Sequence, residues 1–303
     1  MPLNKIILYY GFAPIADPQA VMLWQRTLCE TLELKGRILI SPHGINGTLG
    51  GKMENLKKYA HATKEFKGFS KIDFKWSAGA GNEFSKLNVK VRKELVAFNT
   101  PDEVQVDITG VVNGGKHLKP HQVNELVEKR GDDVVFFDGR NAFEAEIGRF
   151  KNAIVPDIQT THDFVAEIES GKYDHLKDKP IVTYCTGGIR CEILSAVMLN
   201  RGFKEVYQIE GGIVRYGQKY RDSGLWQGAL YVFDNRMTLN FSEDAVTLGT
   251  CVNCSEKTSQ FRDCEGPGCK DLVLLCDECF TDPTNLKCDE SHIRGRKKLQ
   301  QIG

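Results

Sequence analysis

The chain has 303 residues, 41% of them hydrophobic and 26% charged, which is typical of a globular protein with two or three domains. No stretch is long and apolar enough for a membrane helix or a signal peptide, so we expect a cytoplasmic protein without membrane contacts. Positive and negative charges balance overall, but residues 1–100 carry 15 Lys and Arg against 8 Asp and Glu. This basic segment either attracts a polyanion or forms a solvated lysine face.

Residues 1–100 are predicted to form a domain in which strands alternate with two helices. Asp17 and Pro18 have the residue types of an N-cap and a first helical turn. The resulting β-α-β-β-α-β order is that of a ferredoxin-like or acylphosphatase-like fold, which says little about function by itself. The strands are expected at 6–10, 36–40, within 43–51, 73–77 and 87–92, and the helices at 18–34 and 53–66.

Residues 115–228 are predicted to form a second α/β domain with a parallel sheet covered on both faces, because strands and helices alternate along them. Ligands of such sheets bind at the carboxyl ends of the strands, and Cys185 lies at one such end. The strands are expected at 134–140, 180–184 and 205–212, and the helices at 120–129, 161–170 and 193–201.

The segment YCTGGIR places Cys185 between a strand and a helix. Its two glycines allow backbone amides to point toward the sulfur, and the following helix directs its positive end to the same place. Both effects favour a thiolate, which predicts that Cys185 is a nucleophile. Arg190 adds a fixed positive charge that either braces the loop or meets an anionic substrate.

The spacing within this loop distinguishes two classes of cysteine enzyme. Cysteine phosphatases place five residues between the cysteine and the arginine, whereas Cys185 and Arg190 are separated by four. The smaller cradle suits a terminal sulfur or a small group and favours the rhodanese class. Cys191 is either a resolving thiol or a buried residue at the start of the helix. The four loop residues are Thr186, Gly187, Gly188 and Ile189.

Seven of the ten cysteines lie between residues 251 and 288, so residues 229–303 are predicted to form a small Cys-rich module that binds structural zinc. Two pairs have the Cys-x2-Cys spacing of a zinc knuckle. These four cysteines form either a single site or one of two interleaved sites, the second of which includes His292. The candidate ligands are Cys251, Cys254, Cys264, Cys269, Cys276, Cys279 and Cys288.

Several motifs resemble known families. FFDGRNAFEAEIGRFKNAI, YCTGGIR and IEGGI resemble the rhodanese domain. With ISPHGINGTLGG, VFDNRM and the Cys-rich end, nearly the whole chain is similar to the bacterial rhodanese-domain tRNA uridine hydroxylases. This resemblance implies an oxidoreductase that uses dioxygen to convert the wobble uridine of tRNA to 5-hydroxyuridine. It also implies that Cys185 is the catalytic residue, either as a thiol or as a persulfide.

The residues themselves indicate a nucleophilic cysteine but not how oxygen is activated. The chain has neither a dinucleotide fingerprint for a flavin or nicotinamide nor a facial triad of two His and one carboxylate. Two alternatives stay open: a sulfurtransferase that moves sulfane sulfur through a Cys185 persulfide, and a nucleic-acid-binding adaptor with an idle rhodanese domain. No protein partner is predicted.

The basic domain is expected to hold the anticodon loop of tRNA. Its clusters include Lys90, Arg92 and Lys93, whereas residues 101–230 carry 16 basic against 20 acidic side chains and would repel phosphates. Bases of a single-stranded loop can be splayed into a pocket while the phosphates hold the RNA in position. A loop anchored on residues 1–100 must therefore reach across the domain interface to Cys185.

Overall fold

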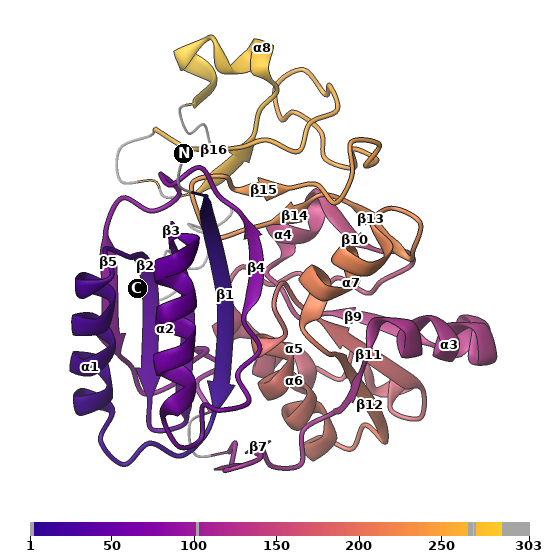
Figure 1. Cartoon of the computed structure of the whole chain (residues 1–303). Helices are drawn as coiled ribbons and strands as arrows, with labels where there is room; N and C mark the ends of the chain where they lie inside the picture. Colours follow the sequence, from indigo (N-terminus) through magenta and orange to yellow (C-terminus); the bar gives the residue numbers. More distant parts are fainter. Residues whose placement is uncertain (1–2, 101–102, 266–268, 270, 287–303) are drawn as a thin grey trace, which may run out of the picture.

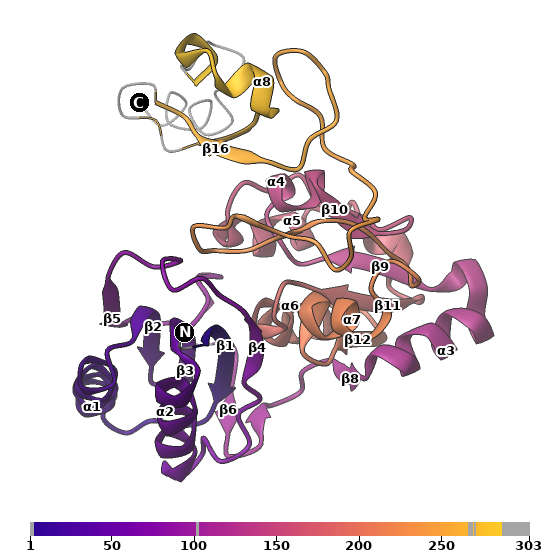
Figure 2. The same ribbon diagram turned by 45° about the horizontal axis from the view of Figure 1, so that its top comes forward.

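The computed structural model describes residues 3–100, 103–265, 269 and 271–286, which form two α/β units and a smaller C-terminal unit (Figures 1 and 2). None of the helices in these ranges combines the length and hydropathy that a membrane crossing requires.

The N-terminal unit is a five-stranded sheet in the order β4-β1-β3-β2-β5, which confirms the predicted order of strands and helices. Only the β2–β5 pair is parallel. Asp17 caps α1 as predicted, since its carboxylate accepts backbone hydrogen bonds from Gln19 and Ala20. The elements are β1 (Asn4–Phe12), α1 (Pro18–Thr31), β2 (Lys35–Ser41), β3 (Gly44–Lys52), α2 (Met53–Glu65), β4 (Lys75–Ala78) and β5 (Leu87–Val91).

The two faces of this sheet have different surroundings. Successive side chains of a strand point to opposite faces, and the residues on one face of β1, β2 and β3 form the core with α1 and α2. Figure 1 shows both helices on that same side of the sheet. The other face, which we call the open face, carries the alternate residues Leu8, Tyr10, Arg37, Leu39, Asn46 and Thr48.

The middle unit is built on a four-stranded parallel sheet in the order β8-β12-β11-β9. Helices α5 and α6 pack on one face and α3 and α7 on the other, as expected for such a sheet. The elements are β8 (Lys116–Leu118), α3 (Pro120–Arg130), β9 (Val135–Asp138), α4 (Ala142–Glu146), α5 (Phe164–Glu169), β11 (Pro180–Tyr184), α6 (Ile189–Asn200), β12 (Glu205–Ile209) and α7 (Gly212–Tyr220).

Helix α6 begins four residues earlier than the sequence predicted, at Ile189 instead of residue 193. The residue before it, Gly188, has a φ of 105°, a left-handed conformation that glycine adopts without strain. The chain can therefore turn directly from the loop into the helix. As a result, Arg190 and Cys191 belong to the first helical turn and their side chains have fixed directions.

The remaining strands form two-stranded ribbons around these units. The ribbons pair β6 (Val106–Asp107) with β7 (Gly110–Val111), β10 (Gly148–Phe150) with β13 (Trp226–Gly228), β14 (Leu230–Tyr231) with β15 (Thr238–Leu239), and β16 (Phe261–Asp263) with β17 (Leu272–Leu274). Helix α8 (Asp277–Phe280) follows β17 in the C-terminal unit, at the top of Figure 1.

Polar contacts join the N-terminal and middle units. Arg215 of α7 forms an ion pair with Asp73 at 2.5 Å, and the Tyr10 hydroxyl donates to the Glu192 carboxylate of α6 at 2.9 Å. Tyr10 belongs to the open face, so this face lies against the first turns of α6. The end of β11 and the loop after it are therefore enclosed between the two units.

Candidate active site

Cys185 is the first residue after β11, in the loop that leads into α6. The side chain is only 1% exposed, and the backbone N–H of Gly188 donates to its sulfur at 3.2 Å. The glycine conformation that starts α6 thus also turns an amide toward the thiol. This arrangement stabilises negative charge on sulfur.

Burial by itself would raise the pKa of Cys185, because a thiolate is poorly solvated inside a protein. A hydrogen bond from the Cys191 thiol, the positive charge of Arg190, and the backbone N–H groups of Cys191 and Gly188 outweigh burial and lower the pKa to about 6. Burial, followed by the neighbouring Cys185 sulfur, raises the pKa of Cys191 well above its ordinary value. At neutral pH Cys185 is therefore the thiolate and Cys191 the protonated donor.

Alkylation by iodoacetamide tests this ionisation, because the thiolate is the reacting form. The rate at Cys185 should rise with pH and reach half its maximum near pH 6, where the pKa of Cys185 lies. Cys29 serves as a control, because burial raises its pKa to about 12. Peptide mass spectrometry after short labelling follows both residues. A half-maximum near pH 8.5 to 9 at Cys185 would contradict the lowered pKa.

The glycine pair Gly211 and Gly212 allows the start of α7 to pack against the Cys185 loop. The N–H groups of Ile213 and Val214, at the start of α7, donate to the carbonyl oxygens of Cys185 and Thr186 at 3.0 and 3.1 Å. This requires close contact of the two backbones: a Cβ on Gly212 would lie 2.4 Å from the Cys185 carbonyl oxygen. The glycine pair of the IEGGI motif therefore allows α7 to fix the Cys185 loop.

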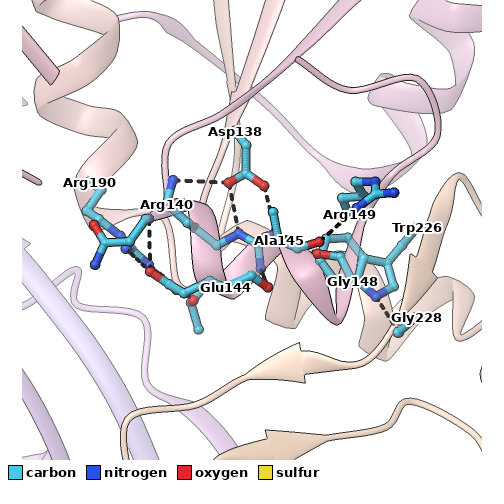
Figure 3. A network of polar contacts seen from close by, with 11 residues as sticks. Asp138, Arg140, Glu144, Ala145, Gly148, Arg149, Arg190, Trp226 and Gly228 are labelled. Atoms are coloured by element: carbon cyan, nitrogen blue, oxygen red, sulfur yellow. Dashed lines mark hydrogen bonds and ion pairs between the residues drawn. The ribbon is translucent and has the colours of Figure 1, made fainter. Parts of the chain in front are cut away.

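Arg190 is held by a carboxylate within the protein. Its two terminal nitrogens donate to the two oxygens of Glu144 at 2.5 and 2.9 Å, and Glu144 is fully buried (Figure 3). Of the two roles that the sequence left open, this geometry favours bracing of the loop. Sequence reasoning did not identify Glu144 as the partner, although the AFEAE segment contains it.

A second buried ion pair, between Asp138 and Arg140, supports the segment that contains Glu144. Asp138, at the end of β9, accepts from the side chain of Arg140 at 2.6 and 2.8 Å, and both residues are completely buried. Arg140 also donates to the backbone carbonyls of Glu144 and Gly148, and Trp226 lies 5.2 Å from its guanidinium (Figure 3). These contacts fix the segment that presents Glu144 to Arg190.

Cys185 faces a cavity of about 400 Å³ that the N-terminal and middle units form together. The open face contributes one wall, and the Cys185 loop contributes the other. Arg92 lines this cavity, whereas the other two predicted RNA-binding residues, Lys90 and Lys93, are exposed but do not line it. The residues that the open face contributes are Leu8, Tyr10, Arg37, Leu39, Asn46 and Thr48.

The two Cys-x2-Cys pairs form one cluster that can bind a metal ion. The sulfur atoms of Cys251, Cys254, Cys276 and Cys279 all lie within 4.8 Å of one another. Tetrahedral zinc with bonds of 2.3 Å to sulfur separates its ligands by about 3.8 Å. Cys254 and Cys276 have a sulfur–sulfur distance of 3.6 Å, which fits this geometry.

The predicted second metal site would use cysteines outside this cluster. Cys264 and Cys269 are not members of the four-cysteine cluster. Their expected co-ligands, Cys288 and His292, lie outside the described residues. The two-site arrangement therefore stays a prediction.

Three family models match the chain along most of its length. Residues 4–95 match a UPF0176 acylphosphatase like domain, residues 119–219 a rhodanese-like domain, and residues 227–291 a rhodanase C-terminal domain. The first two agree with the folds of the N-terminal and middle units.

Relatives from several bacteria are similar over nearly the whole chain, and each is named tRNA uridine(34) hydroxylase. The protein of Corynebacterium jeikeium (strain K411) is 64% identical over 99% of this chain and 95% of its own. That of Corynebacterium urealyticum (strain ATCC 43042 / DSM 7109) is 63% identical over 95% of this chain and 96% of its own. That of Arthrobacter sp. (strain FB24) is 61% identical over 96% of this chain and 99% of its own.

Proposed function

This chain belongs to the tRNA uridine(34) hydroxylase family, and on that premise we propose that Cys185 is the nucleophile in the hydroxylation of uridine 34 of tRNA. The observation that supports this role is the position of the Cys185 sulfur, which accepts a hydrogen bond from the Gly188 N–H and faces a cavity between the basic unit and the middle unit. The same surroundings lower the pKa of Cys185. The chain is thus an oxidoreductase, and the sulfurtransferase alternative has less support. A cytoplasmic location is part of this proposal, because bacterial tRNA is made and used in the cytoplasm.

The thiolate suits the chemistry of uracil. Ring carbon C6 is electrophilic, because the C4 carbonyl withdraws electrons through the C5–C6 double bond. Addition of the Cys185 sulfur to C6 moves electron density to C5, the carbon that receives the hydroxyl oxygen. Dioxygen, which the family resemblance implies, supplies that oxygen atom, and an external two-electron donor together with two protons reduces its second atom to water. Loss of the C5 proton and departure of the Cys185 thiolate from C6 then restore the C5–C6 double bond. Arg190, held by Glu144, keeps the thiolate charged until the base arrives.

The test of this function is mass spectrometry of nucleosides from tRNA of cells with and without the gene. Loss of 5-hydroxyuridine on deletion, and its return with the full-length gene, would support the proposal. Unchanged 5-hydroxyuridine accompanied by a loss of thiolated nucleosides would favour the sulfurtransferase alternative instead.

The anticodon loop is the part of tRNA that fits between the units, because its bases can leave the stack and enter the cavity. Lys90 and Lys93 lie exposed on and just after edge strand β5, next to Arg92 at the cavity. We assign these three residues to phosphates that flank the target base.

Reversal of Lys90, Arg92 and Lys93 to Glu should weaken tRNA binding and reduce its salt dependence. Removal of three phosphate contacts makes the negative slope of log K against log salt shallower by about 2, because fewer counterions are released on binding. Filter binding at several salt concentrations measures this slope. A matched control reverses Lys172, Lys177 and Lys179 of the middle unit, which changes the net charge equally. Equal slopes for both variants would place the binding surface elsewhere.

The four-cysteine cluster is proposed to hold a structural zinc ion. Four thiolates at these distances are a typical zinc ligand set, and the short strands near them bury few apolar side chains. Elemental analysis of freshly reduced protein should find one or two zinc ions per chain. The Cys276→Ser, Cys279→Ser variant should lose one, whereas Cys29→Ala, a change in α1, should lose none. Absence of metal from the unmodified protein would refute the assignment.

A further inference from the structure

Phe233 is an exposed aromatic residue at the active-site cavity. Its side chain is 55% exposed although it lines the cavity that contains Cys185. Its ring contacts Tyr231 edge-to-face at 5.0 Å, and the Arg190 guanidinium lies 5.6 Å from its centre. Packing therefore supports one side of the ring and leaves the rest free. An exposed aromatic ring in the wall of a cavity offers its face to a planar ligand.

The turn that carries Phe233 is fixed in place. It joins β14 to β15 and closes with a hydrogen bond from the Val232 N–H to the Met237 carbonyl at 2.9 Å. Arg236 donates to Asp234 within the turn at 2.6 Å, and to the Ala78 carbonyl of the N-terminal unit at 3.1 Å. The exposure of Phe233 is thus a property of an ordered segment, which is the VFDNRM motif.

A second polar anchor, Asn235, ties the same turn to the N-terminal unit. Its side-chain amide donates to the Asn82 carbonyl at 2.9 Å, and its backbone N–H donates to the Glu83 carbonyl at 3.1 Å. The turn is therefore held against the N-terminal unit, while the Phe233 ring lies beside Arg190 of the middle unit.

The open face contributes an amide to the same cavity. Asn46 of β3 lines it and is half-buried, and its side chain has no hydrogen-bond partner among the described residues. An asparagine amide offers one donor group and one acceptor. The Watson–Crick edge of uracil presents the complementary pair, with N3–H as a donor and O4 as an acceptor.

From these observations we infer that Phe233 is the stacking platform for the target uracil and that Asn46 reads its Watson–Crick edge. The inference rests on the proposed function and names the residues that select the base. Unstacked bases of single-stranded RNA are recognised in this way, by an aromatic face together with hydrogen bonds to the base edge. Arg37 and Arg92, on the N-terminal side of the same cavity, are suited to the flanking phosphates.

Binding measurements in a Cys185→Ser background separate recognition from chemistry. A fluorescent anticodon stem–loop RNA with uridine at the wobble position is titrated with the full chain, and anisotropy gives Kd. Phe233→Ala should raise Kd about tenfold to a hundredfold, whereas Phe233→Tyr, which keeps the ring, should stay near the parent value. Phe280→Ala is a matched control, because Phe280 is 40% exposed but does not line this cavity. An unchanged Kd for Phe233→Ala would overturn the stacking role.

The edge-reading role of Asn46 is tested by comparing the Kd of two stem–loop RNAs that differ only in the wobble base. The parent protein should bind the uridine stem–loop more tightly than one with N3-methyluridine at the wobble position, which lacks the N3–H donor, and Asn46→Ala should remove this preference. A preference that persists in Asn46→Ala would overturn this assignment. Failure of the proposed function has a different signature: tRNA of the deletion strain would keep its 5-hydroxyuridine, whatever the binding data show.

Discussion

Replacement of Cys185 by serine is expected to abolish the formation of 5-hydroxyuridine, lowering the rate by at least about 10³-fold. The hydrogen bonds and the positive charge around this position stabilise a thiolate with a pKa of about 6. A serine hydroxyl does not ionise near neutral pH and is a much weaker nucleophile. Nucleoside mass spectrometry after incubation of unmodified tRNA with the variant gives the rate.

The adjacent Cys191→Ser variant is the matched control. Cys191 is fully buried and its thiol acts as a hydrogen-bond donor to Cys185, a role that a serine hydroxyl can keep. We therefore expect Cys191→Ser to retain much of the activity. If Cys185→Ser formed 5-hydroxyuridine at the rate of the unmodified protein, Cys185 could not be the nucleophile. If Cys191→Ser were as inactive as Cys185→Ser, Cys191 would have a direct part in the reaction.

The position of Cys185 was predictable because local features determine it. A buried strand, two glycines and a helix follow one another within residues 180–200, and the parallel sheet places such a loop at its carboxyl edge. Spacing also predicted the cluster of two Cys-x2-Cys pairs, which the structure brings together. The start of α6 at Ile189 was missed, because the apolar periodicity becomes clear only from Ile193 onward.

The features that depend on distant parts of the chain were not predictable from local patterns. The carboxylate that meets Arg190 comes from Glu144, 46 residues earlier, and an acidic residue in a short helix is usually at the surface. The cavity wall opposite Cys185 comes from the open face of a different unit. The charge distribution predicted that RNA would lie on residues 1–100, with Lys90, Arg92 and Lys93 among its contacts. The structure adds that Asn46 and Arg92 of that segment share a cavity with Cys185.

The Glu144–Arg190 pair is expected to have the largest effect on stability. Glu144 is completely buried and Arg190 has 9% of its side chain exposed, so neither partner can be solvated if the other is removed. Loss of one partner of a buried ion pair costs about 3–5 kcal/mol, because the remaining charge is left without compensation. Glu144→Ala should therefore lower the free energy of unfolding by this amount, measured by urea denaturation.

A surface pair provides the comparison for this measurement. Glu169 forms an ion pair with Arg201 but is 51% exposed, and such a pair contributes about 0–1 kcal/mol. Glu169→Ala should thus unfold close to the unmodified protein. Glu144→Gln keeps the shape but loses the charge and one of the two acceptor oxygens, and it is the variant to measure where Glu144→Ala does not fold. If Glu144→Gln were as stable as Glu169→Ala, charge compensation of Arg190 would not stabilise the loop. The lowered pKa of Cys185 would then need a source other than a fixed Arg190.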